Sequence, residues 1–422
     1  MLISLNIISF TVKKLSHMKE SFFENRKAII VLIAGCLVVL VSMGIRQTWG
    51  LFYQFFDNDL GINRTQFGLA IGVQMLFWGI TAPLFGMIAD KYGSNRAAFA
   101  AFLFYIVGSY IVINQPASNS IFLVSMGVII GTALGGSAVS VPVAAVGKFF
   151  SDKNRTISVG IVTGSASIGF FVMPLFTKFS NDAYGWQNTV QYFIYFLIFA
   201  GICSLFLFKK DFVDTTNNSF TRDQTAWNAM KEAFKHKGYM LLVAGFFVCG
   251  FQITLVATHI PGYIQQKGLP DWTAAAILAL IGFFNIFGTI GMGFLASKYS
   301  KKILLSILYF SRGVILVLFL FLPASTFTAL SFGVLFGILW LATIPPTNGI
   351  VAQIFGTKYL ATLFGIVFFS HQVGSFLGAY LGGYFFDTYG SYDFAWYLSI
   401  VLSAFAGFVH LPIDERPIMR TA

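Results

Sequence analysis

Long apolar runs, separated by short polar segments, make up most of the chain. A membrane-spanning helix needs roughly 20 mostly apolar residues, and twelve runs have about that length. They cover residues 28–55, 65–89, 97–114, 119–147, 156–178, 189–208, 239–266, 273–296, 302–322, 326–354, 360–386 and 393–411. A transmembrane β-barrel would instead show alternating segments of about 10 residues. The pattern therefore predicts an all-α membrane protein with twelve transmembrane helices.

The composition excludes a water-soluble protein. Of the 422 residues, 57% are hydrophobic and only 10% are charged, whereas soluble proteins carry about 25% charged residues. Cys36, Cys203 and Cys249 lie inside apolar runs without the spacing of a zinc or disulfide site. The sequence has no Walker, HExxH or GxSxG motif. We therefore expect no enzyme activity, no metal and no cofactor.

The basic residues favour one set of loops. If the N-terminus lies inside, 22 of the 27 lysines and arginines fall on the inner side. Only Arg64, Lys178 and Lys267 fall on the outer side, and Arg46 and Arg312 lie inside apolar runs. Cytoplasmic loops of membrane proteins carry this excess of positive charge. We expect a multi-pass protein of the cell membrane with both termini in the cytoplasm, and no nucleic-acid partner for the net charge of +11.

The polar segments divide the chain into five parts. These are an N-terminal tail (1–27), six runs (28–208), a central loop (209–238), six further runs (239–411) and a C-terminal tail (412–422). In the first tail an apolar patch precedes Lys13 and Lys14, the reverse of a signal peptide. We expect a dispensable tail with Met18 as a candidate start of translation. The central stretch from Trp227 to Lys237 is a candidate helix on the membrane surface.

The two sets of six runs are related by an internal repeat. GMIADKYGSNR, from Gly86, matches GFLASKYSKK, from Gly293, at an offset of 207 residues. At an offset of 205, Phe150, Lys153, Gly160, Ile161, Val162, Ser165, Gly169 and Phe171 recur as Phe355, Lys358, Gly365, Ile366, Val367, Ser370, Gly374 and Phe376. Two matches at nearly the same offset indicate a duplicated six-helix unit.

The first of these stretches carries a known signature. Gly86, Asp90, Lys91, Gly93 and Arg96 resemble the loop between helices 2 and 3 of the major facilitator superfamily. The second copy departs from it, with serines in place of the acidic residue and the second glycine. Over residues 28–411, the resemblance implies two six-helix bundles that alternate between inward-open and outward-open states. It also implies that the five signature residues form a cytoplasmic gate.

Two other stretches narrow the resemblance. GIRQTWGLFYQFFDNDLGINRTQFG and FGIVFFSHQVGSFLGAYLGGYFFDTYGSYD are similar to the bacterial branch of the monocarboxylate and oxalate–formate porters, which implies a small organic anion as substrate. Eukaryotic monocarboxylate carriers have a lysine in helix 1, and Arg46 falls at that place. They also have an Asp and an Arg in helix 8, whereas this chain has no charge between Thr273 and Ser297. The resemblance therefore does not extend to that mode of proton coupling.

Arg46 is the main candidate for binding the substrate. A charged arginine inside the bilayer costs about 2.5–3.5 kcal/mol, so it usually faces an aqueous cavity. On a regular helix, Arg46 shares a face with Trp49 and Tyr53. An arginine binds a carboxylate through two parallel hydrogen bonds, and aromatic walls suit an apolar tail. The alternative is that Arg46 extends to the lipid headgroups near the outer end of its helix.

His371 and Gln372 form a second candidate group, in the middle of their run, where the first half has small residues. Histidine is the side chain best suited to carry a proton near neutral pH, so His371 is a candidate for substrate binding and proton coupling. His259, nearer the outer end of its run, is a second coupling candidate. For His371 the alternative is a neutral side chain hydrogen-bonded to a helix neighbour, and for His259 it is a gate residue near the outer loop.

Weaker candidates for contact with the substrate are Gln74 and Trp78 in helix 2 and Asn285 in helix 8. Arg312 lies in helix 9, which is peripheral in the superfamily. That position favours a structural bridge from Arg312 to a serine or to backbone carbonyls of a neighbouring helix.

The sequence thus predicts a monomeric secondary transporter for a small-molecule substrate of the monocarboxylate type. It would work in the lipid bilayer by alternating access, with proton symport or exchange as its driving reaction. One alternative is a porter of neutral or zwitterionic solutes in which Arg46 is structural. The other is a membrane receptor, for which the termini and the central loop offer too little chain for an output domain.

Overall fold

The computed structural model describes residues 26–150, 152–208, 225–356 and 358–418. These residues are helical almost throughout and contain no β-strand. Residues 1–25, including Met18, lie outside the described residues, as do residues 209–224 of the central loop. The predicted helix from Trp227 is present as α11.

The helices follow the predicted runs closely. In the first half they are α2 (Arg26–Thr48), η1 (Trp49–Phe52), α3 (Tyr53–Leu60), α4 (Arg64–Tyr92), α5 (Ser94–Asn114), α6 (Asn119–Phe122), η2 (Leu123–Ile129), α7 (Ile130–Ser137), α8 (Ser140–Phe149), α9 (Asp152–Tyr184) and α10 (Trp186–Ser204). In the second half they are α11 (Ala226–Lys235), α12 (Lys237–Gln266), α13 (Trp272–Lys298), α14 (Lys301–Phe321), α15 (Thr326–Leu339), α16 (Ile344–Phe355), α17 (Leu360–Tyr389) and α18 (Asp393–His410).

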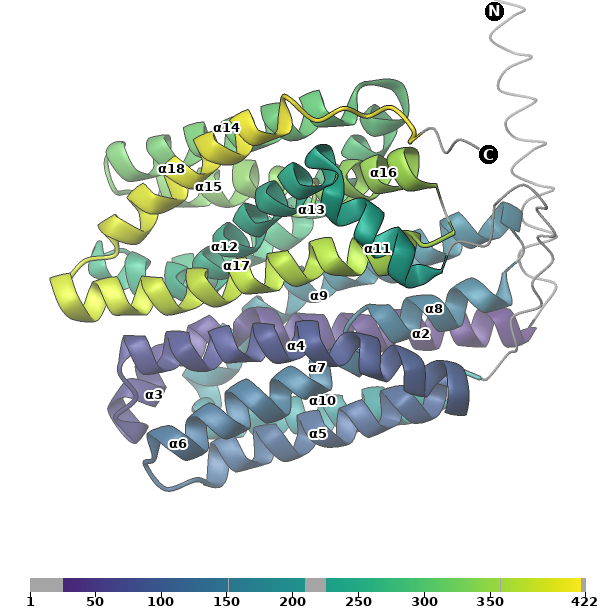
Figure 1. Ribbon diagram of the computed structural model, residues 1–422. Coiled ribbons are helices and arrows are strands. Elements are labelled where there is room, and N and C mark those ends of the chain that lie inside the picture. The colour runs from purple at the N-terminus through teal and green to yellow at the C-terminus, as the bar shows by residue number, and fades with distance from the viewer. Residues whose placement is uncertain (1–25, 151, 209–224, 357, 419–422) are drawn as a thin grey trace, which may run out of the picture.

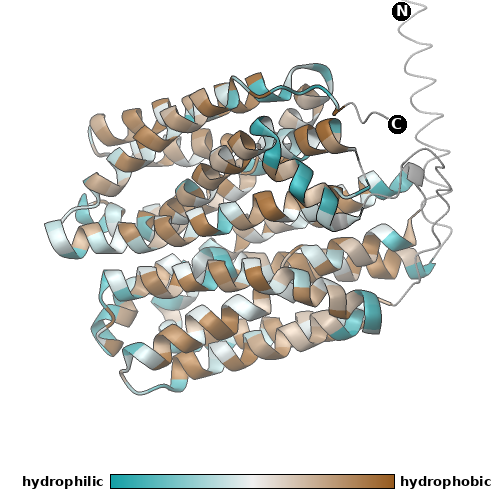
Figure 2. Ribbon diagram, in the orientation of Figure 1, coloured by the Kyte–Doolittle hydropathy of each residue, from teal (hydrophilic) through white to brown (hydrophobic). Residues whose placement is uncertain are grey.

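Within the described residues, 11 helical segments are long and apolar enough to cross a membrane. Each coincides with a predicted run, and Figure 2 shows hydrophobic residues along the helices and hydrophilic ones mainly at their ends. The sixth predicted run is α10, a helix of 19 residues. It is not among the 11 because Gln187, Asn188 and Gln191 make its first turns polar. The all-helical membrane architecture is confirmed, with α10 as its least apolar member.

Two groups of helices pack side by side (Figure 1). Helices α2 to α10 form one group and α12 to α18 the other, and the main contacts between them join α4 to α17 and α9 to α13. Helix α2 begins, and the described chain ends, at the same end of the molecule, which we call the terminal end; the opposite end, near α3, is the far end. The predicted domain limits and the cytoplasmic orientation of the termini remain predictions.

One helix in each half is broken at nearly the same point of the repeat. The fourth run breaks between the end of α7 at Ser137 and the start of α8 at Ser140, and the tenth between Leu339 and Ile344. The matching ends are 202 (339 − 137) and 204 (344 − 140) positions apart, close to the offset of the sequence repeat. A broken helix leaves backbone carbonyls without partners inside the helix. At the second break, side chains far away in the sequence supply the missing hydrogen bonds.

Glycines let α17 pack closely against two neighbours. A methyl group on Gly374 or Gly378 would overlap a backbone oxygen of α12. A methyl group on Gly68 of α4 would overlap the Ala379 oxygen of α17. Such contacts between small residues allow membrane helices to approach closely. They place α17 between α4 of the first group and α12 of its own.

The two groups pack closely at the far end, whereas two glycines at the terminal end have free space beside them. Near the far end, a methyl group on Gly50 of η1 would overlap the Ala257 oxygen of α12. Near the terminal end, Gly86 of α4 and Gly365 of α17 have no neighbouring atom within 4 Å of such a group. The same helix pair that is tightly packed at Gly68 is therefore open at Gly86.

Candidate functional site

Arg46 lies in the last turn of α2 with only 9% of its surface exposed. Its Nη2 donates a hydrogen bond to the Sδ atom of Met75 at 3.0 Å, and its Nη1 lies 3.5 Å from the Gln47 Oε1 atom. The guanidinium also lies 5.9 Å from the centre of the Trp78 ring. Among the described residues no carboxylate forms an ion pair with Arg46. A thioether is a weak acceptor, so the charge of Arg46 is not neutralised.

Gln372 of α17 shares a partner, Met75, with this arginine. The Gln372 Nε2 atom donates to the backbone oxygen of Met75 at 3.1 Å, so Met75 contacts both Arg46 and Gln372. The Gln372 Oε1 atom lies 3.0 Å from the His371 Nδ1 atom. An amide oxygen only accepts, so this bond assigns the proton to Nδ1 and leaves Nε2 as an acceptor. The structure thus connects Arg46 to Gln372 through Met75, and His371 lies one hydrogen bond further, among residues of the second group.

Aromatic rings line the same region and cross between the groups. Trp78 of α4 contacts Phe368 of α17, with ring centres 5.7 Å apart. Phe368 stacks on His371 at 5.7 Å, and Phe246 of α12 lies 5.1 Å from the same imidazole. Trp78 is the ring beside the guanidinium, and the other rings continue from it into the second group.

Trp49 and Tyr53 do not join Arg46, contrary to the shared-face prediction. The Trp49 ring packs against Phe52 and Phe193 in the core of the first group. Tyr53 donates to Asp57 and lies under Arg64 near the far end. For Tyr53 the cause is the 3₁₀ turn η1, which lies between it and α2. With three residues per turn, η1 changes the direction of Tyr53 relative to Arg46.

Gln74 and Asn285 form structural hydrogen bonds. The Gln74 Nε2 atom donates to the backbone oxygen of Met126 inside the first group at 2.9 Å. The Asn285 Nδ2 atom donates to Ser167 of α9 at 2.8 Å, and its Oδ1 atom accepts from the Leu341 N–H at 2.9 Å. Asn285 thus joins the two groups and binds the break after α15. Neither side chain reaches Arg46 through these bonds.

Arg312 bridges to a neighbouring helix, as its peripheral position predicts. It is fully buried, and its Nη2 atom donates to the backbone oxygens of Leu339 and Trp340, each at 2.6 Å. Its Nη1 atom donates to the Gln252 Oε1 atom at 3.3 Å. These carbonyls end α15, where a positive charge is favourable. The structure therefore gives Arg312 backbone partners that Arg46 lacks.

His259 belongs to the closed far end. Its Nε2 atom lies 2.7 Å from the Ala379 oxygen, and its ring packs on Tyr392. Arg64 of the first group donates to the Tyr392 hydroxyl. The backbone N–H and the hydroxyl of Thr65 both donate to one oxygen of Asp387, each at 2.7 Å. We call Arg64, Thr65, Asp387 and Tyr392 the far-end lock, because they join the two groups.

The signature residues lie at the terminal end. Asp90 accepts a hydrogen bond from Lys148 at 2.8 Å, within the first group. Gly93 ends α4 with φ of 105°, which favours glycine. Lys91 lies over the Tyr92 ring, and Arg96 lies in the first turn of α5. The assignment of these residues and Gly86 to a cytoplasmic gate remains a prediction.

Sequence reasoning missed Met75, Phe368 and the far-end lock. Met75 and Phe368 are apolar residues in apolar helices, so nothing in the sequence separates them from lipid-facing neighbours. The lock had a weak signal, since Arg64 is one of only three basic residues on the predicted outer side. Asp387 also had a weak signal, since this acidic residue directly follows the apolar run 360–386.

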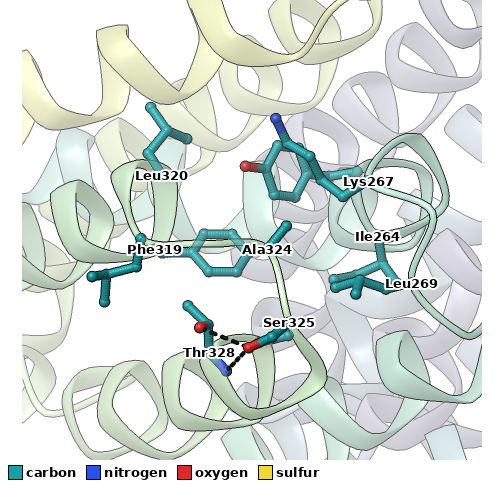
Figure 3. Close-up of a pocket in the computed structure, with 11 residues that line it drawn as sticks. Ile264, Lys267, Leu269, Phe319, Leu320, Ala324, Ser325 and Thr328 are labelled. Carbon is teal, nitrogen blue, oxygen red and sulfur yellow. Dashed lines mark hydrogen bonds between the residues drawn. The ribbon is translucent and has the colours of Figure 1, made fainter.

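A small pocket lies elsewhere, between α12, α14 and α15 near the far end (Figure 3). It has a volume of about 110 Å³ and is lined by residues such as Tyr263, Lys267 and Phe319. The hydroxyls of Ser325 and Thr328 there bond to each other and cap α15. No residue that contacts Arg46 lines this pocket, so it is separate from the arginine site.

Comparisons with known proteins agree with the helical architecture. A family model described as Major Facilitator Superfamily matches residues 34–372 and 292–422. An uncharacterised MFS-type transporter, YcxA of Bacillus subtilis, is 26% identical over 377 residues, covering 85% of this chain and 89% of that protein. Monocarboxylate transporter 12-B of Danio rerio is 24% identical and covers 87% and 83%. Human monocarboxylate transporter 12 is 21% identical and covers 90% and 80%.

Proposed function

Because the chain belongs to the Major Facilitator Superfamily, a family of secondary transporters, we propose that it carries a small monocarboxylate across the cell membrane. The observation that carries the proposal is the buried Arg46 guanidinium without an acidic partner among the described residues. A carboxylate substrate would neutralise it through paired, charge-assisted hydrogen bonds. Relatives named monocarboxylate transporters support the same substrate class.

The partners of the two intramembrane arginines favour one carboxylate over two. A second available guanidinium inside the membrane would favour a dicarboxylate. Arg312 already donates to Leu339, Trp340 and Gln252, which leaves Arg46 as the available guanidinium of the two. The aromatic residues Trp78 and Phe368 beside it offer apolar contacts for the rest of the substrate.

His371 is the proposed proton carrier. It lies one hydrogen bond from Gln372, which in turn contacts the partner of Arg46. Its Nε2 atom is free to accept a proton when Nδ1 donates to Gln372. A proton on His371 would place a second positive charge near the bound anion and so favour loading of both. Proton symport or exchange of anions follows as the proposed driving reaction.

The conformation supports alternating access. If the terminal end is cytoplasmic, the closed far end and the open terminal end correspond to an inward-facing state. The far-end lock would then open, and the region around Gly86 close, in the outward-facing state. We propose that a monomer performs this cycle, with Gly86, Asp90, Lys91, Gly93 and Arg96 as the cytoplasmic gate.

Uptake into proteoliposomes with an inside-alkaline pH gradient tests the proposal. The panel is labelled lactate, pyruvate, formate and oxalate, each run with the wild type and with Arg46→Ala. We expect gradient-driven uptake of a monocarboxylate, lost in Arg46→Ala and weak for oxalate. Absence of uptake of every acid, with protein that binds another solute, would refute the proposal and favour a porter of neutral solutes.

A further inference from the structure

We infer that Met75 is a positioning residue that holds Arg46 in the empty protein and is displaced by the substrate anion. The inference rests on the proposed function, because the anion that displaces Met75 is the proposed monocarboxylate. Met75 is fully buried in α4 and contacts Arg46 of α2 through its side chain. Its backbone oxygen contacts Gln372 of α17. One residue therefore touches both groups of helices and the Arg46 cation.

The chemistry of the contact suits a temporary partner. The Sδ atom of Met75 lies 3.0 Å from the Arg46 Nη2 atom, but a thioether is a weak and uncharged acceptor. A carboxylate forms stronger, charge-assisted bonds with the same nitrogens. Sulfur therefore orients the guanidinium without competing strongly against the anion. An acidic or amide side chain at this position would compete with it.

The location of Met75 also connects the arginine to the contact between the groups. Met75 lies one helical turn from Gly79, where an added methyl group would be 3.0 Å from the Gln372 Cγ atom. Met75 thus has two roles: its side chain moves when the anion binds, and its backbone oxygen accepts the hydrogen bond from Gln372. Because α4 and α17 pack closely here, a shift at Met75 acts directly on the contact between the groups.

Two substitutions of similar size separate this role from simple packing. Met75→Gln provides a stronger acceptor for Arg46, and Met75→Leu removes the acceptor but keeps the bulk. In the proteoliposome assay with the monocarboxylate carried by the wild type, we expect Met75→Gln to raise KM about tenfold with little change in kcat. Met75→Leu should change KM less than about threefold. Equal effects of the two variants on KM, or a loss confined to kcat, would overturn the inference.

A second readout needs no substrate. Phenylglyoxal modifies arginine, and mass spectrometry of the purified full-length protein follows its reaction at Arg46, with the 89% exposed side chain of Arg416 as internal standard. We expect the fastest modification in Met75→Leu, an intermediate rate in the wild type and the slowest in Met75→Gln. A different order would overturn the Met75–Arg46 contact. If the order holds and no variant carries an acid, the proposed function fails, and displacement by an anion fails with it.

Discussion

Two arginines lie inside the membrane-spanning helices, one in each half, and their surroundings differ. Arg312 donates to two backbone carbonyls and an amide oxygen, and it fills the break between α15 and α16. Arg46 donates to a sulfur at 3.0 Å and has an amide oxygen at the limit of hydrogen bonding. One guanidinium has strong acceptors, and the other has weak ones.

The difference separates a structural charge from a functional one. A buried arginine is costly wherever it stands, but Arg312 satisfies carbonyls that would otherwise lack partners. Its cost is offset by the helix break that it stabilises. Arg46 stabilises no such break and satisfies no backbone carbonyl among the described residues. This is the pattern expected of a charged group that binds an external anion. Burial alone would have ranked Arg312 above Arg46 as a candidate site.

The largest expected effect separates the two arginines by activity. Arg46→Ala should lower monocarboxylate uptake about 100-fold, because hydrogen bonds to charged groups contribute about 1.5–3 kcal/mol. The amount of folded protein should stay near that of the wild type, since Arg46 has only weak protein partners. Uptake by reconstituted protein, normalised to the folded fraction, measures the effect. Full activity of Arg46→Ala would remove the contrast between the arginines.

The second effect concerns stability and should fall on the other arginine. Arg312→Met removes the donors to Leu339 and Trp340, and each buried polar group left unpaired costs about 1–3 kcal/mol. We expect Tm of the detergent-solubilised protein to fall by about 10 °C, whereas Arg46→Met should leave it within about 3 °C. Thermal unfolding of both variants tests this difference. Similar Tm values for Arg312→Met and Arg46→Met would show that Arg312 does not stabilise the fold more than Arg46 does.

A lysine at each position sharpens the comparison through geometry. Arg46→Lys keeps the charge but loses the paired hydrogen bonds of the guanidinium, so KM should rise about tenfold while uptake remains measurable. Arg312→Lys should transport with an unchanged KM, because the side chain at this position does not contact the anion. Uptake over a range of substrate concentrations gives both constants. A higher KM in Arg312→Lys would place that residue in the substrate site.

The smallest effect concerns the driving force. His371→Gln keeps a hydrogen-bonding side chain beside Gln372 but cannot carry a proton at neutral pH. We expect gradient-driven uptake to fall about threefold, while exchange of labelled for unlabelled anion at equal pH persists. Parallel assays with and without the gradient separate the two reactions. Unchanged stimulation by the gradient in His371→Gln would exclude His371 as the proton carrier.

The membrane architecture could be predicted because apolar length and the internal repeat are properties of the sequence itself. The breaks in the fourth and tenth runs also lie at nearly the same place in the repeat. The surroundings of Arg46 were not predicted. The sequence offered Arg46, His371 and Gln372 as candidates for one substrate site, and that assignment stays a prediction. The direct partner of Arg46, Met75, depends on how three helices cross, which residue spacing along one helix does not encode.

The face shared by Arg46, Trp49 and Tyr53 failed for a local reason. A face that includes Tyr53 requires one regular helix, but the 3₁₀ turn from Trp49 to Phe52 lies between Arg46 and Tyr53. No proline in this stretch signals the change. Trp49 itself packs on Phe52 and Phe193 inside the first group. Residues beyond the end of a helix are therefore poor members of a predicted face, even when the apolar run continues through them.

The uncompensated charge of Arg46 also has an electrical consequence. Moving one elementary charge through a potential of about 100 mV changes its energy by about 2.3 kcal/mol. Under the proposed function, the empty site carries the positive charge of Arg46, and a monocarboxylate bound without a proton on His371 would cancel it. In such anion exchange, voltage would act on the empty protein and spare the loaded one. A proton on His371 would restore the positive charge of the loaded site, so the voltage dependence of uptake would differ between exchange and proton symport.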